Sequence, residues 1–356
     1  MWLEGALAPM THPATDPSSG NGAKPSPIRD GCARSASWRT EEKNYSLSYR
    51  EVFLLGMKIN KLKKRLSNKE KILLDAAMGT ELQRKGVNTT LPLWSAEALI
   101  SDPAIVKQIH IENILAGAEI ITTNTFRTTN YTLKKKSKEK IAGELTGHAV
   151  LLAKEAIYES KIKKTIFIAG SVAPLEDCYR PDLTPPHEVL IKEHLKNVKN
   201  LKAAGVDFLL FETMITKVEI LTLCEAAIKT NMPFAISFCC NQKGQLLSGE
   251  DLTYVIKKLE KYQPLFISIN CISPTIVNPL ISIMKKSTDL PVGVYANGDG
   301  NPDGRQGWCF HGLNQAEVYK YYAIEWFKSG VQIIGGCCGS NAFYISLLTN
   351  YLGKKT

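Results

Sequence analysis

The stretch GVQIIGGCCGSN, residues 330–341, runs from an apolar segment into two glycines and two adjacent cysteines. Its apolar part has the length of a short buried strand, and the chain contains seven more runs of this kind. They are KILLDAA (71–77), AEIITTNTF (118–126), TIFIAGSV (165–172), DFLLFET (207–213), PFAISFCC (233–240), LFISINC (265–271) and PVGVYANG (291–298). Each run is continuous rather than alternating, which is typical of parallel strands that are covered on both faces.

Helical patterns separate these runs. PAIVKQIHIENILAGA (103–118) and PHEVLIKEHLKNVKNLKAAG (186–205) carry apolar residues at helical spacing and close near a glycine, a common helix stop. Eight strand–helix units predict the α/β class and a (β/α)8 TIM barrel, whose usual size is roughly 250 residues. A doubly wound nucleotide-binding sheet is disfavoured, because LLDAAMGTEL (73–82) lacks the G-x-G-x-x-G pattern after the first strand. We expect the glycine-rich GDGNPDG (298–304) to be a loop.

The chain divides by composition into three parts. Residues 1–56 include MTHPATDPSSGNGAKPSPIRDG (10–31), which cannot bury enough apolar surface to offset the entropy of ordering, so we expect a disordered extension. This extension is either a targeting segment or an upstream addition with Met57 as an alternative start. Residues 57–70 are predicted to be a basic linker or helix, and residues 71–352 to be the single barrel domain.

The composition is typical of a globular protein, with 356 residues of which 44% are hydrophobic and 22% are charged. No apolar run reaches the roughly 18 residues that a membrane span needs. The net charge of +10 includes two basic runs, KINKLKKRLSNKEK (58–71) and LKKKSKEK (133–140), which we interpret as solvated segments. We therefore expect neither nucleic acid nor a membrane as a partner.

The nine cysteines indicate metal binding or catalysis rather than a disulfide scaffold. Their number is odd, the chain is large, and we see no secretory leader, so we expect a reducing, cytoplasmic setting. The active sites of barrels form where the strands end, and Cys271, Cys337 and Cys338 follow the sixth and eighth predicted strands. Three thiolates suit Zn2+ and leave one tetrahedral position open, in which a substrate thiol would become a thiolate nucleophile at neutral pH.

Other interpretations of the cysteines stay open at this point. Buried cysteine is a common small core residue, and we favour that interpretation for Cys224, Cys239 and Cys240. GGCCGS (335–340) could instead bind a phosphorylated ligand, since barrels often hold phosphate near the eighth strand. A non-catalytic protein with a structural zinc site is the third possibility.

Seven segments together resemble the homocysteine S-methyltransferase family. They occur in the family's order and cover nearly the whole predicted barrel: LLDAAMGTELQRKG (73–86), LWSAEAL (93–99), AGAEIITTNTF (116–126), AGSVAP (169–174), FETMITKVE (211–219), ISINC (267–271) and GGCCGS (335–340). The resemblance implies the same barrel, one zinc ion held by Cys271, Cys337 and Cys338, and methyl transfer to the sulfur of L-homocysteine to give methionine. Residues 71–352 would then form the homocysteine-binding domain.

The resemblance also implies where the amino acid part of homocysteine binds. The turn Asp75, Ala76, Ala77, Met78 and Gly79 would hold it together with Glu212, whose carboxylate can pair with the substrate ammonium. Backbone N–H groups of the turn are expected to bind the substrate carboxylate. Two further strand-end residues, Thr125 and Asn270, are also predicted to bind substrate.

The sequence departs from the family's pattern in that same turn. The family often has Asp-Gly-Gly where this chain has Asp75-Ala76-Ala77, and alanine does not adopt the positive φ values of glycine cheaply. This difference puts the exact backbone geometry of the turn in question more than its chemistry.

The methyl donor is the part of the expected reaction that the sequence determines least. Members of the family use a sulfonium such as S-methylmethionine, a quaternary ammonium such as betaine, or a folate, and a cationic donor favours aromatic walls. The aromatic candidates and one arginine near strand ends are Trp94, Phe126, Arg127, Tyr295 and Trp308. The betaine branch resembles TFTFY where this chain has TNTFR (123–127), so we favour S-methylmethionine. A different thiol or selenol acceptor, such as selenocysteine, stays open, and the oligomeric state is not predicted.

Overall fold

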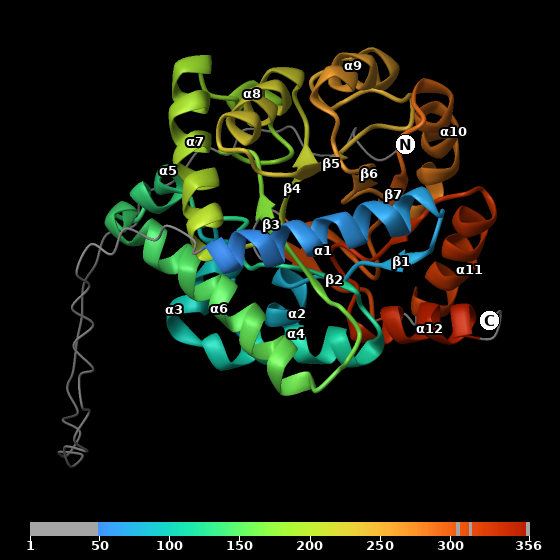
Figure 1. The fold of residues 1–356 in the computed structure, drawn as a ribbon, viewed down its shortest axis with the longest axis horizontal. Helices are drawn as coiled ribbons and strands as arrows, with labels where there is room; N and C mark the ends of the chain where they lie inside the picture. The colour runs from blue at the N-terminus through green and yellow to red at the C-terminus, as the bar shows by residue number, and fades with distance from the viewer. Residues whose placement is uncertain (1–48, 304–306, 313–314, 354–356) are drawn as a thin grey trace, which may run out of the picture. The chain divides into compact units, whose positions relative to one another are not determined.

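The computed structural model describes residues 49–303, 307–312 and 315–353, so most of the extension expected to be disordered lies outside the described residues. Eight parallel strands form a barrel with helices around it, which confirms the predicted (β/α)8 class (Figure 1). The strands are β1 (Ile72–Leu73), β2 (Ile120–Thr122), β3 (Phe167–Val172), β4 (Phe208–Met214), β5 (Phe234–Phe238), β6 (Ile267–Asn270), β7 (Val292–Tyr295) and β10 (Ile333–Ile334). Seven of them lie within one of the eight apolar runs, and β4 extends one residue beyond its run, to Met214.

Hydrogen bonds close the barrel between its first and second strands. The strands follow the order β1-β10-β7-β6-β5-β4-β3-β2 around the sheet, and β1 meets β2 through a bridge between Leu74 and Ile120. Asp75 N–H donates to the Ile120 carbonyl at 3.0 Å. The Asp75 carboxylate accepts from Thr122 N–H at 2.7 Å. A side chain therefore continues the ladder where these short strands end.

Helices surround the strands. They are α2 (Gly79–Arg84), α3 (Ala98–Ser101), α4 (Pro103–Ala116), α5 (Asn130–Lys134), α6 (Ala142–Ser160), α7 (His187–Ala204), α8 (Lys217–Lys229), α9 (Leu252–Leu259), α10 (Val277–Ser287), α11 (Gln315–Lys328) and α12 (Ala342–Gly353). The two predicted helices are confirmed as α4 and α7, and both end at a left-handed glycine, Gly117 (φ 112°) and Gly205 (φ 80°). None of the described helices is long and apolar enough to cross a membrane.

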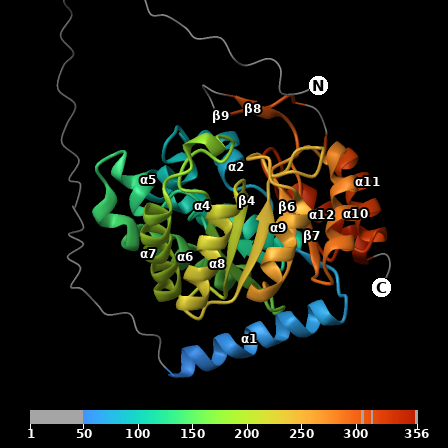
Figure 2. The ribbon, with the colours of Figure 1, turned by 90° about the horizontal axis from the view of Figure 1, so that it is seen from above.

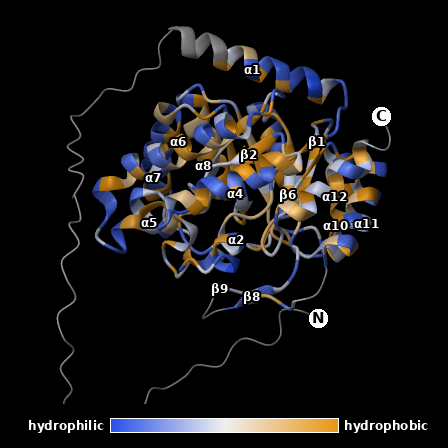
Figure 3. Cartoon of the chain, turned by 90° about the horizontal axis from the view of Figure 1, so that it is seen from below, coloured by the Kyte–Doolittle hydropathy of each residue, from blue (hydrophilic) through white to orange (hydrophobic). Residues whose placement is uncertain are grey.

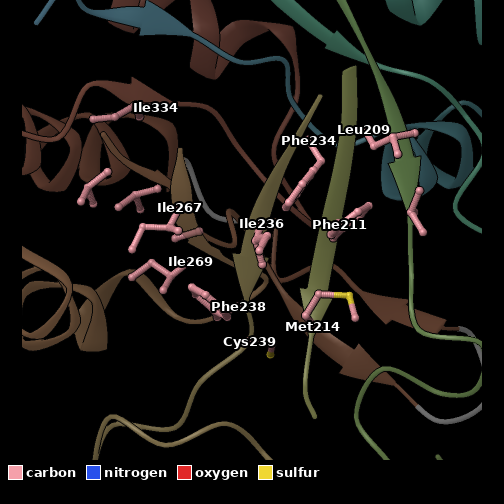
Figure 4. Packing of buried hydrophobic residues seen from close by; sticks show 14 of the residues in the cluster. Leu209, Phe211, Met214, Phe234, Ile236, Phe238, Cys239, Ile267, Ile269 and Ile334 are labelled. Atoms are coloured by element: carbon pink, nitrogen blue, oxygen red, sulfur yellow. The ribbon is translucent and has the colours of Figure 1, made fainter. Parts of the chain in front are cut away.

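The core has two layers because successive side chains of a strand point to opposite faces. In β1 and the residue after it, Ile72 and Leu74 belong to a cluster inside the barrel, whereas Leu73 belongs to the cluster between strands and helices. Figure 4 shows part of the outer layer, in which Phe238, Cys239 and Ile269 lie near one another. Cys239 and Cys240 are buried in this apolar layer, as are the neighbouring strand residues.

A helix that precedes the first strand packs on the barrel. This helix, α1 (Tyr49–Ser67), begins within the segment 1–56 and carries much of the basic run. Its residues Leu62 and Leu66 are buried in the inner cluster, and the carbonyl of Leu66 accepts from Gln332 Nε2 at 2.8 Å. Lys58 pairs with Asp207 at 2.7 Å. Figures 2 and 3 show α1 at one end of the barrel.

A small hairpin lies at the opposite end of the barrel. Its strands β8 (Asn301–Asp303) and β9 (Gly307–Cys309) pair in antiparallel fashion, well away from α1 in Figure 2. The expectation that 298–304 is simply a loop was therefore wrong for Asn301–Asp303. The error arose because three residues with a proline show no strand pattern.

Candidate metal and substrate site

Three cysteine sulfurs converge at the carboxyl end of the barrel. Cys271 directly follows β6, and Cys337 and Cys338 follow β10 after two glycines. Their Sγ atoms all lie within 4.8 Å of one another, and Cys271 Sγ is 3.8 Å from Cys338 Sγ. With Zn–S bonds near 2.3 Å, the edge of a tetrahedron is about 3.8 Å, so the sulfur set fits a zinc ion with three thiolate ligands.

The two glycines allow the end of β10 to pass close to the first strand. A Cβ on Gly335 would stand 2.7 Å from the Asp75 carbonyl oxygen, and one on Gly336 would stand 2.2 Å from Ser340 Oγ. The Gly336 N–H donates to the Asp75 carbonyl at 3.0 Å. The close approach therefore explains why glycines separate a buried strand from the cysteines, and it brings Cys337 beside the Asp75 turn.

The thiols also influence one another electrostatically. Hydrogen bonds from Cys271 and Cys338 hold the pKa of Cys337 well below its usual value, despite its burial. The same pairing raises the pKa of Cys271 well above the ordinary range. Binding of a divalent cation would favour the ionised form of all three.

The sulfurs open into a cavity of about 430 Å3 at the carboxyl end of the strands. Most of the predicted site residues line it: Asp75, Ala76, Ala77, Met78, Gly79, Trp94, Phe126, Arg127, Glu212, Tyr295, Trp308 and the three cysteines. Thr125 and Asn270 were also predicted to bind substrate, but both are buried and neither lines the cavity. Their side chains bond to other strands of the barrel. Thr125 Oγ1 donates to the Ser171 carbonyl of β3 at 2.7 Å, and the Asn270 amide bonds to Thr213 of β4.

Glu212 is a half-buried carboxyl group on the cavity wall. It lies on β4, and the Ser171 hydroxyl of β3 donates to its Oε1. Burial raises the pKa of Glu212 to about 8, although the bond from Ser171 opposes the shift, and the charges of Cys337 and Asp75 add to it. A carboxyl group held in such a place gains from a bound ammonium group, which would restore its charged form.

Asp75 has a structural role as well as a place in the cavity. Burial raises its pKa to about 7, while hydrogen bonds from Thr122 lower it. The turn that follows uses its own N–H groups: Ala76 N–H donates to Asn113 Oδ1 at 2.9 Å, and Ala77 N–H to Ser340 Oγ at 3.3 Å. These two N–H groups therefore bond within the protein, and binding of the substrate carboxylate by other N–H groups of the turn stays a prediction.

The two alanines of the turn need no glycine-like backbone. Neither Ala76 nor Ala77 is among the residues with positive φ. The substitution of alanine for glycine at these positions thus causes no strain here, and the concern raised by the sequence is resolved. Gly79 does need to be small, because a Cβ there would stand 2.2 Å from Nε1 of Trp94.

Arg127 is mostly engaged by the protein itself. Its Nη1 donates to the carbonyls of Pro174 and Glu176, at 3.3 and 2.8 Å. Its guanidinium carbon is 5.1 Å from the centre of the Phe126 ring, while Nε is buried with no hydrogen-bond partner. Arg127 thus anchors the chain that follows β3 and also lines the cavity.

Sequence reasoning missed the loop after β3 as part of the site. Cys178 and Tyr179 both line the cavity, and Tyr179 Oη lies 3.0 Å from Cys271 Sγ. One sequence signal could have identified this loop: the segment EDCYRPD (176–182) follows a predicted strand, and barrel active sites form where the strands end.

Comparison with known proteins places this geometry in a family. The profile of the family described as homocysteine S-methyltransferase matches residues 72–352. The homocysteine S-methyltransferase of Escherichia coli is 31% identical over 305 residues, covering 81% of this chain and 97% of that protein. The selenocysteine methyltransferase of Astragalus bisulcatus is 29% identical, covering 75% of this chain and 88% of that one. The metallated crystal form of the Escherichia coli homocysteine methyltransferase MmuM superposes with a TM-score of 0.71 at 29% identity, covering 82% and 99% of the two chains.

Proposed function

Because the chain belongs to the homocysteine S-methyltransferase family, we propose that it methylates the thiol of L-homocysteine, with S-methylmethionine as the donor and one zinc ion held by Cys271, Cys337 and Cys338. The observation that carries the proposal is the convergence of three sulfurs within 4.8 Å on a cavity that is also lined by the carboxyl group of Glu212. Bound zinc would supply the positive charge that keeps a substrate thiol ionised at neutral pH.

The protein's own groups would orient the acceptor. Glu212 lines the same cavity as the cysteines and would accept a charge-assisted hydrogen bond from the homocysteine ammonium. Ser171 fixes the carboxyl group of Glu212 by donating to one of its oxygens. An acceptor held at its ammonium end presents its thiol at a defined place, which converts part of the binding energy into orientation.

A sulfonium donor fits the character of the cavity wall. Trp94, Phe126 and Tyr179 line it, and aromatic faces attract cations. S-methylmethionine also carries a carboxylate, and the positively charged Arg127 lines the same cavity. In the reaction the homocysteine thiolate attacks the methyl carbon, a new S–C bond forms, and the old S–C bond breaks with its electron pair returning to the donor sulfur. Both products are methionine.

The phosphate-binding alternative is disfavoured by the backbone of the GGCCGS segment. An anion would need its N–H groups, yet five of them donate within the protein: Gly335 to Val294, Gly336 to Asp75, Cys337 to Ala296, Gly339 to Thr80 and Ser340 to Cys337. A selenol acceptor remains the second candidate, because a relative of this chain is named as a selenocysteine methyltransferase.

The test is methionine formation by the purified, zinc-loaded protein. L-homocysteine would be offered with S-methylmethionine, betaine or a methylated folate in separate reactions, and L-selenocysteine would replace homocysteine in a parallel set. We expect turnover with homocysteine and S-methylmethionine. Turnover with betaine or folate alone would refute the donor assignment, and turnover with selenocysteine alone would refute the acceptor assignment.

A further inference from the structure

A tyrosine from the loop after β3 contacts one of the three cysteines. The hydroxyl oxygen of Tyr179 lies 3.0 Å from Cys271 Sγ, although the two residues are 92 positions apart. Tyr179 is 38% exposed as a residue and lines the cavity. A phenol has an ordinary pKa near 10 and so carries its proton at neutral pH, whereas a metal-bound thiolate can only accept. The hydroxyl is therefore the donor in the metal-bound protein.

The loop that delivers Tyr179 is anchored at successive residues before it. Arg127 Nη1 holds the carbonyls of Pro174 and Glu176, and Glu219 Oε1 accepts from Leu175 N–H at 2.9 Å. Asp177 Oδ1 accepts from Tyr179 N–H at 2.9 Å.

The side chain of Glu176 adds two more anchors to this loop. It accepts from Tyr131 Oη at 2.8 Å and from Lys135 Nζ at 2.5 Å. The backbone is therefore held from several sides, which gives Tyr179 a fixed starting point from which its hydroxyl reaches Cys271.

We propose that Tyr179 is a positioning residue of the metal centre, whose hydroxyl donates a hydrogen bond to the Cys271 thiolate and holds that sulfur in its zinc-binding geometry. The inference rests on the zinc assigned in the proposed function. Cys271 itself has a backbone φ of 57°, an uncommon conformation for a residue other than glycine. A hydrogen bond that fixes its side chain therefore acts on a residue whose backbone is strained.

Charge gives the hydrogen bond a second effect. Three thiolates exceed the charge of one Zn2+ by one negative unit, in a cavity that also contains the carboxyl groups of Asp75 and Glu212. A hydrogen-bond donor to one sulfur would draw part of that excess charge away from the metal. The metal would then stabilise a fourth thiolate, that of the substrate, more strongly. Hydrogen bonds to metal ligands commonly change metal affinity or activity by roughly 10–100-fold when they are removed.

The experiment compares Tyr179→Phe with wild type and with Tyr158→Phe, a change at an 85% exposed tyrosine on α6. In competition with a chelator, Tyr179→Phe should bind zinc at least about tenfold more weakly than the other two proteins. In the cobalt-substituted variant the sulfur-to-metal charge-transfer absorption should move to longer wavelength, because a thiolate that accepts no hydrogen bond donates electrons to the metal more easily. Neither readout depends on turnover.

The outcomes separate this inference from the proposed function. Equal zinc affinity and equal cobalt spectra in Tyr179→Phe and wild type would overturn the role of Tyr179 alone. A wild-type protein that takes up no zinc would overturn the proposed function together with it.

A measurement on the unmutated position keeps the test decisive if the variant fails to fold. 3-Fluorotyrosine placed at 179 in the full chain should change its 19F shift when zinc is added, whereas the same label at 158 should not. An unchanged signal at 179 would contradict the proposal.

Discussion

The side-chain amide of Asn270 is bonded to Thr213 at both of its ends. Oδ1 accepts from Thr213 N–H at 2.9 Å, Nδ2 donates to Thr213 Oγ1 at 2.9 Å, and Nδ2 is also 3.9 Å from Cys337 Sγ. Thr213 has a φ of 57°, which is costly for a β-branched residue. Since Thr213 follows Glu212 and Asn270 precedes Cys271, one amide ties the proposed ammonium site to the metal site.

Removing that amide should therefore destabilise the protein and disturb both sites. Asn270→Ala leaves the buried N–H of Thr213 without its partner, so we expect the free energy of unfolding to fall by at least about 1–3 kcal/mol. The KM for homocysteine should rise as well. Urea unfolding and steady-state kinetics measure the two effects. Asn278→Ala, at an exposed position of α10, is the matched control, and equal stability of the two variants would contradict the assigned role.

Loss of a metal ligand should abolish both zinc and turnover. Cys338→Ala removes one of three sulfurs, and two thiolates hold zinc far more weakly than three. We expect less than one tenth of the wild-type zinc content after dialysis, measured by atomic absorption, and no detectable methionine formation. Cys309→Ser, an exposed cysteine on β9, should retain both properties. Full activity in Cys338→Ala would refute the metal assignment.

Replacing the Glu212 carboxyl group should weaken homocysteine binding. A hydrogen bond to a charged group contributes about 1.5–3 kcal/mol, so Glu212→Gln should raise the homocysteine KM by roughly 10–100-fold. The KM for the donor should change much less, because the donor has no ammonium–Glu212 contact in the proposed arrangement. Initial rates with each substrate varied in turn test this, and equal rises for both substrates would argue that Glu212 acts on the whole cavity.

The same residue should make stability depend on pH. Burial raises the pKa of Glu212 to about 8 and that of Asp75 to about 7, so the folded protein holds these protons where the unfolded chain, near pH 4–5, has released them. The free energy of unfolding must then fall as the pH rises between the unfolded and folded values, by up to about 1.4 kcal/mol per pH unit for each group.

Glu212→Gln should remove its share of that slope. Urea unfolding of the reduced, metal-free protein at pH 5, 6.5 and 8 measures it, with Glu225→Gln on the exposed face of α8 as the control. A wild-type stability that stays level or rises over this range would show that the two carboxyl groups are ionised in the folded protein.

The difference between what sequence predicted and what it missed follows from the range of the interactions. The eight strands could be predicted because parallel strands buried on both faces are continuous apolar runs. The three cysteines could be placed together because strand ends share one edge of a barrel.

The roles of Asp75 and Tyr179 could not be predicted in this way. Asp75 closes the barrel by bonding to Thr122, and Tyr179 reaches Cys271 from a loop with no periodicity. Both depend on the path of the chain in space, which short-range patterns do not specify. The two alanines of the turn illustrate the opposite error. A local rule about glycine suggested backbone strain at these positions, but neither alanine has a positive φ.

The helix α1 offers a last prediction, because its basic sequence conceals a packing role. Leu62 is fully buried in the inner cluster of the barrel, whereas Met57 on the same helix is 57% exposed. Leu62→Ala should lower the free energy of unfolding by about 2–5 kcal/mol, the usual cost of truncating a buried leucine. Met57→Ala removes a similar volume from solvent-facing surface and should cost about 0.5 kcal/mol or less. If urea unfolding gave the same stability for both variants, α1 would be a solvated appendage rather than the cover of the barrel.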